Sequence, residues 1–100
     1  MGKPAAMGTQ PTTGHGCYPP TTVTGTASTV KINGQSAMTQ GDPMAAHCKV
    51  CGKSRPCHAS SVSAGSGSVT IEGKPAARIG DSIGCGCAVA GASSNVFIGG

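Results

Sequence analysis

One short stretch of the chain recurs, and this internal repeat constrains the fold more than any other feature. Residues 69–81 contain a short strand, a glycine turn, a Pro-Ala-Ala-Arg corner and a Gly-Asp exit. Residues 30–42 follow the same pattern 39 positions earlier. A third copy is split, since residues 96–100 supply its strand and turn and residues 2–6 supply its corner. A fixed-period repeat of this kind indicates a fold built from equivalent units.

The split copy predicts how the chain closes. If each repeat is one physical unit, Gly100 lies near Gly2, and the molecule has approximate threefold symmetry. Apolar and polar residues alternate at the strand of each copy, which is the period of a half-buried β-strand. Asn33-Gly34 is a strong signal for a tight turn. No segment has helical periodicity, so we predict an all-β fold of short strands and loops.

The composition leaves little material for a hydrophobic core. The chain has no Leu and no Trp, and Val, Ile and Phe together account for 13 of its 100 residues. Its net charge of +4 is too small to favour disorder by charge repulsion. We therefore expect a single domain over residues 1–100 that depends on an additional restraint, as small domains do when they use disulfides or a metal.

Six Cys and three His are the candidates for this restraint. The N-terminus lacks the apolar run of a signal peptide, so we expect folding in a reducing cytoplasm, where Cys and His clusters are more often metal ligands than disulfides. Each repeat sends a loop beyond its Gly-Asp exit, and these loops carry His or Cys. We predict that the three loops hold one structural zinc ion, because zinc takes four such ligands tetrahedrally. The predicted ligands are His15, His47, His58 and Cys85.

Cys85 is preferred to Cys87 because it follows Asp81 by four residues, much as His47 follows Asp42 by five. The two aspartates themselves are expected to hold turns through side-chain hydrogen bonds.

Two other arrangements of the central loop remain open. Cys48-x2-Cys51 has the spacing of a zinc half-site and would form a local knuckle with Cys57 and His58. Such a knuckle restrains only one loop and leaves the repeats unconnected. The other arrangement is a Cys48–Cys57 or Cys51–Cys57 disulfide, formed after the protein meets an oxidising environment.

The composition also argues against two classes of function. Nucleic-acid binding ordinarily adds aromatic stacking residues, whereas Tyr18 and Phe97 are the only aromatic residues here, and we expect both to be packing groups. We expect no enzymatic activity, because no Cys is in a recognisable nucleophile setting. Small buried thiols are the simplest interpretation of Cys17 and Cys87.

The repeat residues also resemble a known family. Residues 73–81 contain the Pro-Ala-Ala-Arg motif itself, and residues 96–100, Val-Phe-Ile-Gly-Gly, look like the usual family ending. The chain resembles the PAAR-repeat proteins over nearly all of its length. It departs from the pattern at Ser36-Ala37-Met38-Thr39, at Met7 in place of Arg, and in its Cys-rich central loop.

The resemblance implies a small cone that acts as a structural tip, capping and sharpening the trimeric valine–glycine-repeat spike of a bacterial type VI secretion system or a related phage tail. The family's cone holds a zinc ion near its vertex with three His and one Cys, which matches the four ligands predicted above. Membrane puncture and effector delivery are the implied roles. No effector extension is expected, because the chain stops at Gly100.

Partners and location are implied in the same way. The expected partners are the trimeric spike, effector proteins and, transiently, a target membrane, but not nucleic acid. The protein would assemble in the bacterial cytoplasm and then be delivered by the machine to the target cell. The alternative is a small zinc-binding or redox module that uses the Cys48–His58 cluster. Residues expected in the partner-binding base of the cone are Val30, Ile32, Val69, Ile71, Val96 and Ile98.

Overall fold

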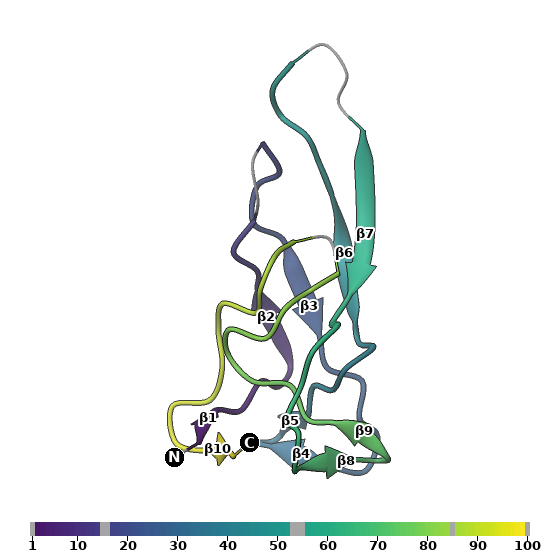
Figure 1. Cartoon of the computed structure of the whole chain (residues 1–100). Coiled ribbons are helices and arrows are strands. Elements are labelled where there is room, and N and C mark those ends of the chain that lie inside the picture. The colour runs from purple at the N-terminus through teal and green to yellow at the C-terminus, as the bar shows by residue number, and fades with distance from the viewer. Residues whose placement is uncertain (1, 15–16, 53–55, 85, 100) are drawn as a thin grey trace.

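The computed structural model of the chain is an elongated all-β molecule that narrows from one end to the other (Figure 1). It describes residues 2–14, 17–52, 56–84 and 86–99, and its principal extents are 43 × 26 × 21 Å. These residues contain ten strands and no helix, which confirms the all-β fold expected from the sequence. Over the same residues, no helix suited to crossing a membrane is found.

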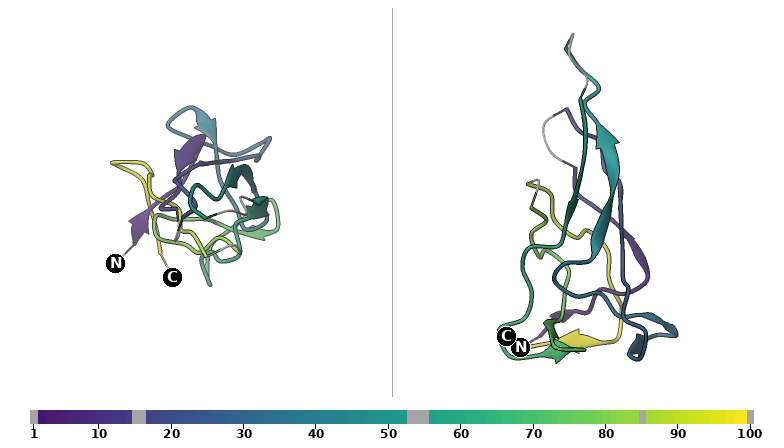
Figure 2. Two further views of the ribbon diagram at one scale, coloured as in Figure 1. Left: turned by 90° about the horizontal axis from the view of Figure 1, so that it is seen from above. Right: turned by 90° about the vertical axis from the view of Figure 1, so that its right-hand side faces the viewer.

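Six two-residue strands lie at the wide end in three antiparallel pairs (Figures 1 and 2). Each pair consists of the strand and the corner of one repeat. The pairs are β1 (Lys3–Pro4) with β10 (Phe97–Ile98), β4 (Lys31–Ile32) with β5 (Gln35–Ser36), and β8 (Thr70–Ile71) with β9 (Lys74–Pro75).

The turns of the second and third repeats have the same backbone geometry. Asn33 and Gly34 have φ angles of 52° and 79°, and Glu72 and Gly73 have φ angles of 53° and 80°. Positive φ at both central residues is the signature of the two-residue hairpin turn that matches the twist of the flanking strands. The turn predicted at Asn33-Gly34 is therefore confirmed.

The pairing of β1 with β10 completes the first repeat from the two ends of the chain. Lys3 lies opposite Ile98, and Pro4 lies opposite Phe97. This confirms that the last strand and the first corner form one unit, although Gly100 itself lies outside the described residues. The described ends of the chain therefore meet at the wide end of the molecule (Figure 2).

A closed ring of backbone hydrogen bonds joins the three repeats. Ala6 N–H donates to the Ala77 carbonyl at 3.0 Å, Ala77 N–H donates to the Met38 carbonyl at 2.9 Å, and Met38 N–H donates to the Ala6 carbonyl at 3.1 Å. These three residues occupy equivalent positions in the three corners and are fully buried. The ring shows that the pseudo-threefold symmetry read from the sequence exists in the structure.

The aspartate at each Gly-Asp exit holds the corner that precedes it. Asp42 accepts from the Thr39 backbone N–H at 2.8 Å, and Asp81 accepts from the Arg78 backbone N–H at 2.7 Å. Both aspartates are buried. Their predicted role in turns is therefore confirmed.

A four-stranded antiparallel sheet connects the wide end with the narrow end (Figure 1). Its order is β2 (Thr9–Pro11), β3 (Thr22–Thr24), β6 (Pro43–Cys48) and β7 (Cys57–Ser61). The β6–β7 hairpin extends farthest from the base. The sheet thus carries the central loop of the sequence to the narrow end.

The small core is divided into two layers. The layer at the wide end contains Ile32, Ile71 and Ile98 from the three repeats together with the corner alanines. The layer above it contains Val23, Met38, Met44, Val62, Ile83 and Val89 among its residues. Neither layer reaches the far end of the β6–β7 hairpin, so contacts of another kind must hold the narrow end together.

Candidate metal centre

A β-bulge in β6 directs His47 toward the interior of the molecule. Met44 lies opposite Ser60, but His47 lies opposite His58, so β6 has one more residue than β7 between these pairs. The extra residue belongs to the exposed pair Ala45 and Ala46. Met44 and His47 are both buried, whereas regular alternation would place them on opposite faces. The bulge therefore returns His47 to the inner face, as bulges do when they re-aim a side chain.

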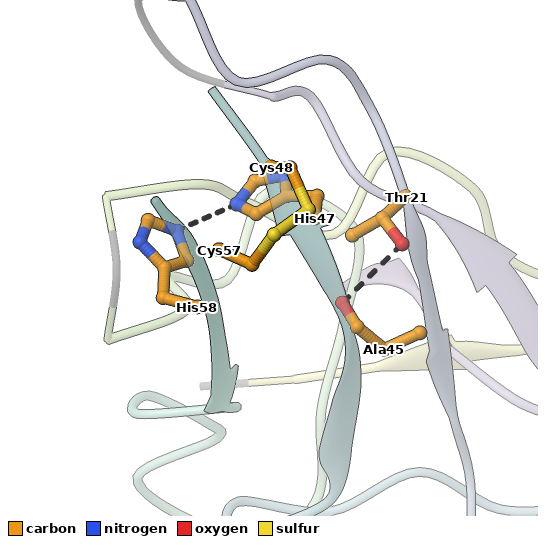
Figure 3. Close-up of a disulfide and its surroundings, with 6 residues drawn as sticks. All are labelled: Thr21, Ala45, His47, Cys48, Cys57 and His58. Atoms are coloured by element: carbon orange, nitrogen blue, oxygen red, sulfur yellow. Dashed lines mark hydrogen bonds between the residues drawn. A yellow bond between two sulfur atoms is a disulfide. The ribbon is translucent and has the colours of Figure 1, made fainter. Parts of the chain in front are cut away.

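A side-chain hydrogen bond from the neighbouring strand region holds the bulge. The Thr21 hydroxyl donates to the Ala45 carbonyl at 3.3 Å (Figure 3). This contact satisfies a carbonyl next to the point where the register of the β6–β7 ladder shifts. The position of His47 consequently depends on a segment outside its own hairpin.

The imidazole rings of His47 and His58 meet across the hairpin through their Nε2 atoms, which are 2.7 Å apart (Figure 3). Two nitrogen ligands of a tetrahedral zinc ion lie about 3.3 Å apart, given bonds of roughly 2.0–2.1 Å. The two rings would therefore have to separate by only about 0.6 Å to admit the ion between these atoms. The donor atoms and their approach fit a zinc centre.

The backbone of the first loop, the segment between β2 and β3 that contains Pro19, sets the tautomer of His47. The Nδ1 atom of His47 lies 2.8 Å from the carbonyl oxygen of Pro19, which can only accept a hydrogen bond. Nδ1 therefore carries the proton, and in a neutral ring Nε2 keeps its lone pair, directed toward His58. A carbonyl behind a histidine is the usual way in which proteins orient a metal ligand.

Tyr18 supports the other histidine. Its ring stacks on His58 with centroids 4.2 Å apart and lies 5.0 Å from the His47 ring at a tilt of 38°. The expected packing role of Tyr18 is thus confirmed, with the histidine pair as its partner. Phe97 is different, because 58% of its surface is exposed at the wide end, so the expectation that it is a packing group is wrong.

Two disulfides surround the histidine pair. Cys48 and Cys57 lie directly opposite each other at the ends of β6 and β7 and are bonded (Figure 3). Cys17 is bonded to Cys51, which ties the first loop to the central one. The same bulge that brings the histidines together also aligns Cys48 with Cys57. Sequence spacing left this pairing open beside Cys51–Cys57, because the register of the hairpin decides which residues face each other.

These pairings decide between several expectations for the cysteines. The Cys48–Cys57 disulfide was one of the alternatives, whereas Cys51 pairs with Cys17 and not with Cys57. Cys17 is therefore not a simple buried thiol. Cys87 is buried and lies in the upper core layer, as expected for it. The local knuckle needs Cys48, Cys51 and Cys57 as thiolates, but the structure engages all three in disulfides.

Of the four ligands predicted for zinc, the structure brings His47 and His58 together. His15 and Cys85 lie outside the described residues. Within the described parts of the chain, no group of three or more potential ligands occurs. The zinc ion and the complete ligand set therefore stay predictions, supported by the facing Nε2 atoms and the oriented tautomer of His47. The contacts of Pro19 with His47 and of Tyr18 with His58 were not predicted, although both residues follow within two positions of Cys17 in a loop that carries His15, a predicted ligand.

The residues predicted for the partner-binding base lie at the wide end, but their side chains pack on the core. Ile32, Ile71 and Ile98 are 6–8% exposed, and Val30, Val69 and Val96 are partly buried against the same core layer. In each repeat, the residue between the half-buried Val and the buried Ile is exposed to solvent. These exposed residues are Lys31, Thr70 and Phe97, one from each repeat.

Comparison with known proteins agrees with this geometry. A family model described as the PAAR motif matches residues 13–91. The chain belongs to the PAAR-motif family. No protein among the curated ones matches the chain. The PAAR motif is associated with the spike tip of type VI secretion, and the PAAR module described here has a threefold wide end and a narrow end that carries the histidine pair.

Proposed function

We propose that this PAAR module is a structural tip that caps and sharpens the trimeric valine–glycine-repeat spike of a type VI secretion system. The observation that carries the proposal is the closed ring through Ala6, Met38 and Ala77, because it arranges three equivalent units around one axis. A threefold partner can then contact three near-equivalent surfaces. A role in membrane puncture and effector delivery follows from this position, with assembly in the bacterial cytoplasm before delivery to the target cell.

The wide end is the surface that would contact the spike. Its outward positions, Lys31, Thr70 and Phe97, are equivalent in the three repeats but differ in chemistry. Phe97 is the largest apolar side chain exposed there, and buried aromatic anchors dominate many interfaces. We therefore propose that Phe97 is the main anchor on the spike. The adjoining valines, which are half-buried, would form the floor beneath it.

A binding measurement with the purified chain and a trimeric β-helical spike tests this assignment. We expect Phe97→Asp to weaken binding about tenfold or more, as loss of a hot-spot residue does. Val50→Asp is the matched control, because Val50 is 59% exposed, nearly the same as Phe97, but follows β6 at the narrow end. The proposal is wrong if the wild-type chain does not bind the blunt end of the spike, or if only the Val50 variant loses binding.

We also propose that His15, His47, His58 and Cys85 hold one zinc ion with a structural role. A zinc ion bound by four protein ligands leaves no open position and ties together the loops that hold it. Metal binding in such a module is coupled to folding, so it would stiffen an end that neither core layer reaches. The observations that support this ligand set are the contact of His47 Nδ1 with the Pro19 carbonyl and the facing Nε2 atoms of His47 and His58.

Metal content and single substitutions test the zinc proposal. We expect about one zinc per chain, and each of His15→Ala, His58→Ala and Cys85→Ser to reduce both metal content and stability. Thr24→Ala is a control on the exposed face of β3 that should retain the metal. If the ligand substitutions leave metal content unchanged, while Cys48→Ser and Cys51→Ser abolish it, the local zinc module is the correct alternative.

A further inference from the structure

Each disulfide of the narrow end is adjacent in sequence to a residue that forms or supports the histidine pair. Cys48 follows His47, and Cys57 precedes His58. Cys17 precedes Tyr18, which stacks on His58. The disulfides therefore hold the same three segments that hold the two imidazole rings. Breaking or forming either disulfide therefore alters the restraint on a residue directly next to His47, His58 or Tyr18 in the chain.

Non-covalent contacts hold these segments as well, among them the His47–Pro19 and Thr21–Ala45 hydrogen bonds described above. Beyond the His47–His58 pair, the hairpin has a backbone hydrogen bond from Lys49 N–H to the Pro56 carbonyl at 2.9 Å. The first loop is linked to the hairpin by a hydrogen bond from Val50 N–H to the Cys17 carbonyl, also at 2.9 Å. Both bonds lie in exposed loops, where water competes with them. The two disulfides add covalent restraints at the ends of these segments, which water cannot displace.

We propose that the two disulfides form a thiol–disulfide exchange site that controls how the histidine pair is held, and thereby its affinity for a divalent metal ion. The metal part of this inference rests on the zinc site of the proposed function. Oxidation would fix Tyr18 and Pro19 against the rings and keep the two Nε2 atoms facing each other. Reduction would release the three segments and lower the affinity, because an unrestrained site must be ordered before it binds.

Both disulfides include exposed cysteine residues that a dithiol reductant can approach. Cys48, Cys51 and Cys57 are exposed, and Cys17 is half-buried, so each bridge has at least one accessible residue. A thiolate of the reductant attacks one sulfur, forms a mixed disulfide and displaces the other cysteine as a thiolate. The second thiol of the reductant then displaces the first cysteine. Each bridge gains two electrons and two protons, and the reductant leaves as its disulfide; a disulfide oxidant reverses the step.

Zinc affinity in the two redox states is the first test. The full chain, oxidised or treated with a phosphine reductant, is titrated with Zn²⁺ in competition with a chromophoric chelator. We expect affinity to fall about tenfold on reduction, within the usual range of coupling between two sites. The double variants Cys17→Ser/Cys51→Ser and Cys48→Ser/Cys57→Ser should show weakened binding without reductant. In the variant with all four substitutions, the phosphine should change nothing.

The geometry of the rings is the second test and needs no metal. The chain has one tyrosine, so its ring signals in an NMR spectrum are unambiguous. We expect a nuclear Overhauser contact between Tyr18 and His58 in the oxidised chain and its loss on reduction. The amide protons of Ala6, Met38 and Ala77 should stay protected from exchange in both states, which shows that the wide end remains folded.

The outcomes separate this inference from the proposed function. Equal zinc affinity in both redox states overturns the control of metal binding, and a Tyr18–His58 contact that survives reduction overturns the control of geometry. Tighter binding by the reduced wild type alone also overturns the inference, because the thiolates would then be ligands. If no form binds zinc, the zinc part of the proposed function is wrong, and the ring contact alone decides whether the disulfides hold the pair.

Discussion

Met38 donates its backbone N–H to the Ala6 carbonyl at 3.1 Å, which joins the corner of the second repeat to that of the first. The same bond recurs twice around the ring, through Ala77. Ring closure matters because the strands at the wide end are only two residues long. Such short ladders are marginal by themselves. The three corners stabilise one another instead, and all three ring residues are fully buried.

Met38→Ala should destabilise the protein without opening this ring. Met38 is fully buried in the upper core layer, whereas the equivalent positions in the other repeats are Ala6 and Ala77. The substitution keeps the backbone N–H but leaves a cavity, so we expect the free energy of unfolding to fall by about 2–5 kcal/mol. Urea unfolding measures this change, with the exposed Val50→Ala as a control that should have little effect. A loss equal to that of the control would contradict the prediction.

Asp81→Ala should cost more stability than Arg78→Thr. Asp81 accepts hydrogen bonds from the Arg78 backbone and from its guanidinium at 3.0 Å, and this contact raises the pKa of Arg78 above its ordinary value. Removing the carboxylate leaves a buried cation without its partner, with an expected cost of about 3–5 kcal/mol. Arg78→Thr copies Thr39, which bonds Asp42 in the same way through its backbone. Thermal or urea unfolding of both variants tests the order, and equal losses would contradict it.

Glu72 should make the contact between the second and third repeats sensitive to acid. Hydrogen bonds from the Thr29 side chain and backbone lower the pKa of Glu72 from its ordinary value of 4.5. Because the folded-state pKa is depressed, the stabilisation is present above the ordinary value and is lost as pH falls through the folded-state pKa. An NMR titration of the Glu72 carboxyl should give a pKa below 4.5 that rises toward this value in Thr29→Ala. The same pKa in both proteins would contradict the assignment.

The second repeat provides an internal control for this acid sensitivity. Asn33, which is equivalent to Glu72, donates to Asn95 at 3.0 Å, and this neutral contact has no carboxyl group to protonate. We therefore expect the surroundings of Asn33 to be unchanged over the pH range in which Glu72 titrates. Parallel shifts at both turns would indicate general unfolding.

Deletion of both Ala45 and Ala46 should abolish zinc binding while leaving the wide end folded. His47 would then directly follow Met44, so it would lie opposite Ala59 on the outer face and no longer opposite His58. Deletion of Ala46 alone is the matched control, because it removes only the extra residue of the bulge and leaves His47 opposite His58 with regular alternation. Metal analysis and the amide protection of Met38 measure the two effects, and normal zinc content in the double-deletion variant would contradict the prediction.

The repeat architecture could be predicted because it depends on local signals. Asn33-Gly34 and Glu72-Gly73 lie in equivalent turns with positive φ angles, and such turns are encoded by a few adjacent residues. The split third copy even predicted that the chain ends would meet, as the pairing of Lys3 with Ile98 confirms. The hydrogen bonds that Asp42 and Asp81 accept in their turns were expected on the same local basis.

The narrow end could be predicted only in part. His47 and His58 were expected to converge, and they do, but Cys17 was not expected to pair with Cys51. The expected reducing compartment argued against disulfides, and the central cysteines were left open between a local zinc knuckle and a Cys48–Cys57 or Cys51–Cys57 disulfide. Their spacing contained no information on which loop would lie beside Cys51.

The sequence by itself therefore determined three strand-and-turn units that close on one another, since backbone conformation at a turn is a property of neighbouring residues. The tertiary structure decided which side chains face each other at the narrow end. There, one extra residue in β6 places His47 opposite His58 and Cys48 opposite Cys57. Side chains alternate between the faces of a strand, so a shift of one position changes both the partner and the face. That shift is set by pairing between strands and leaves no periodic mark in the sequence.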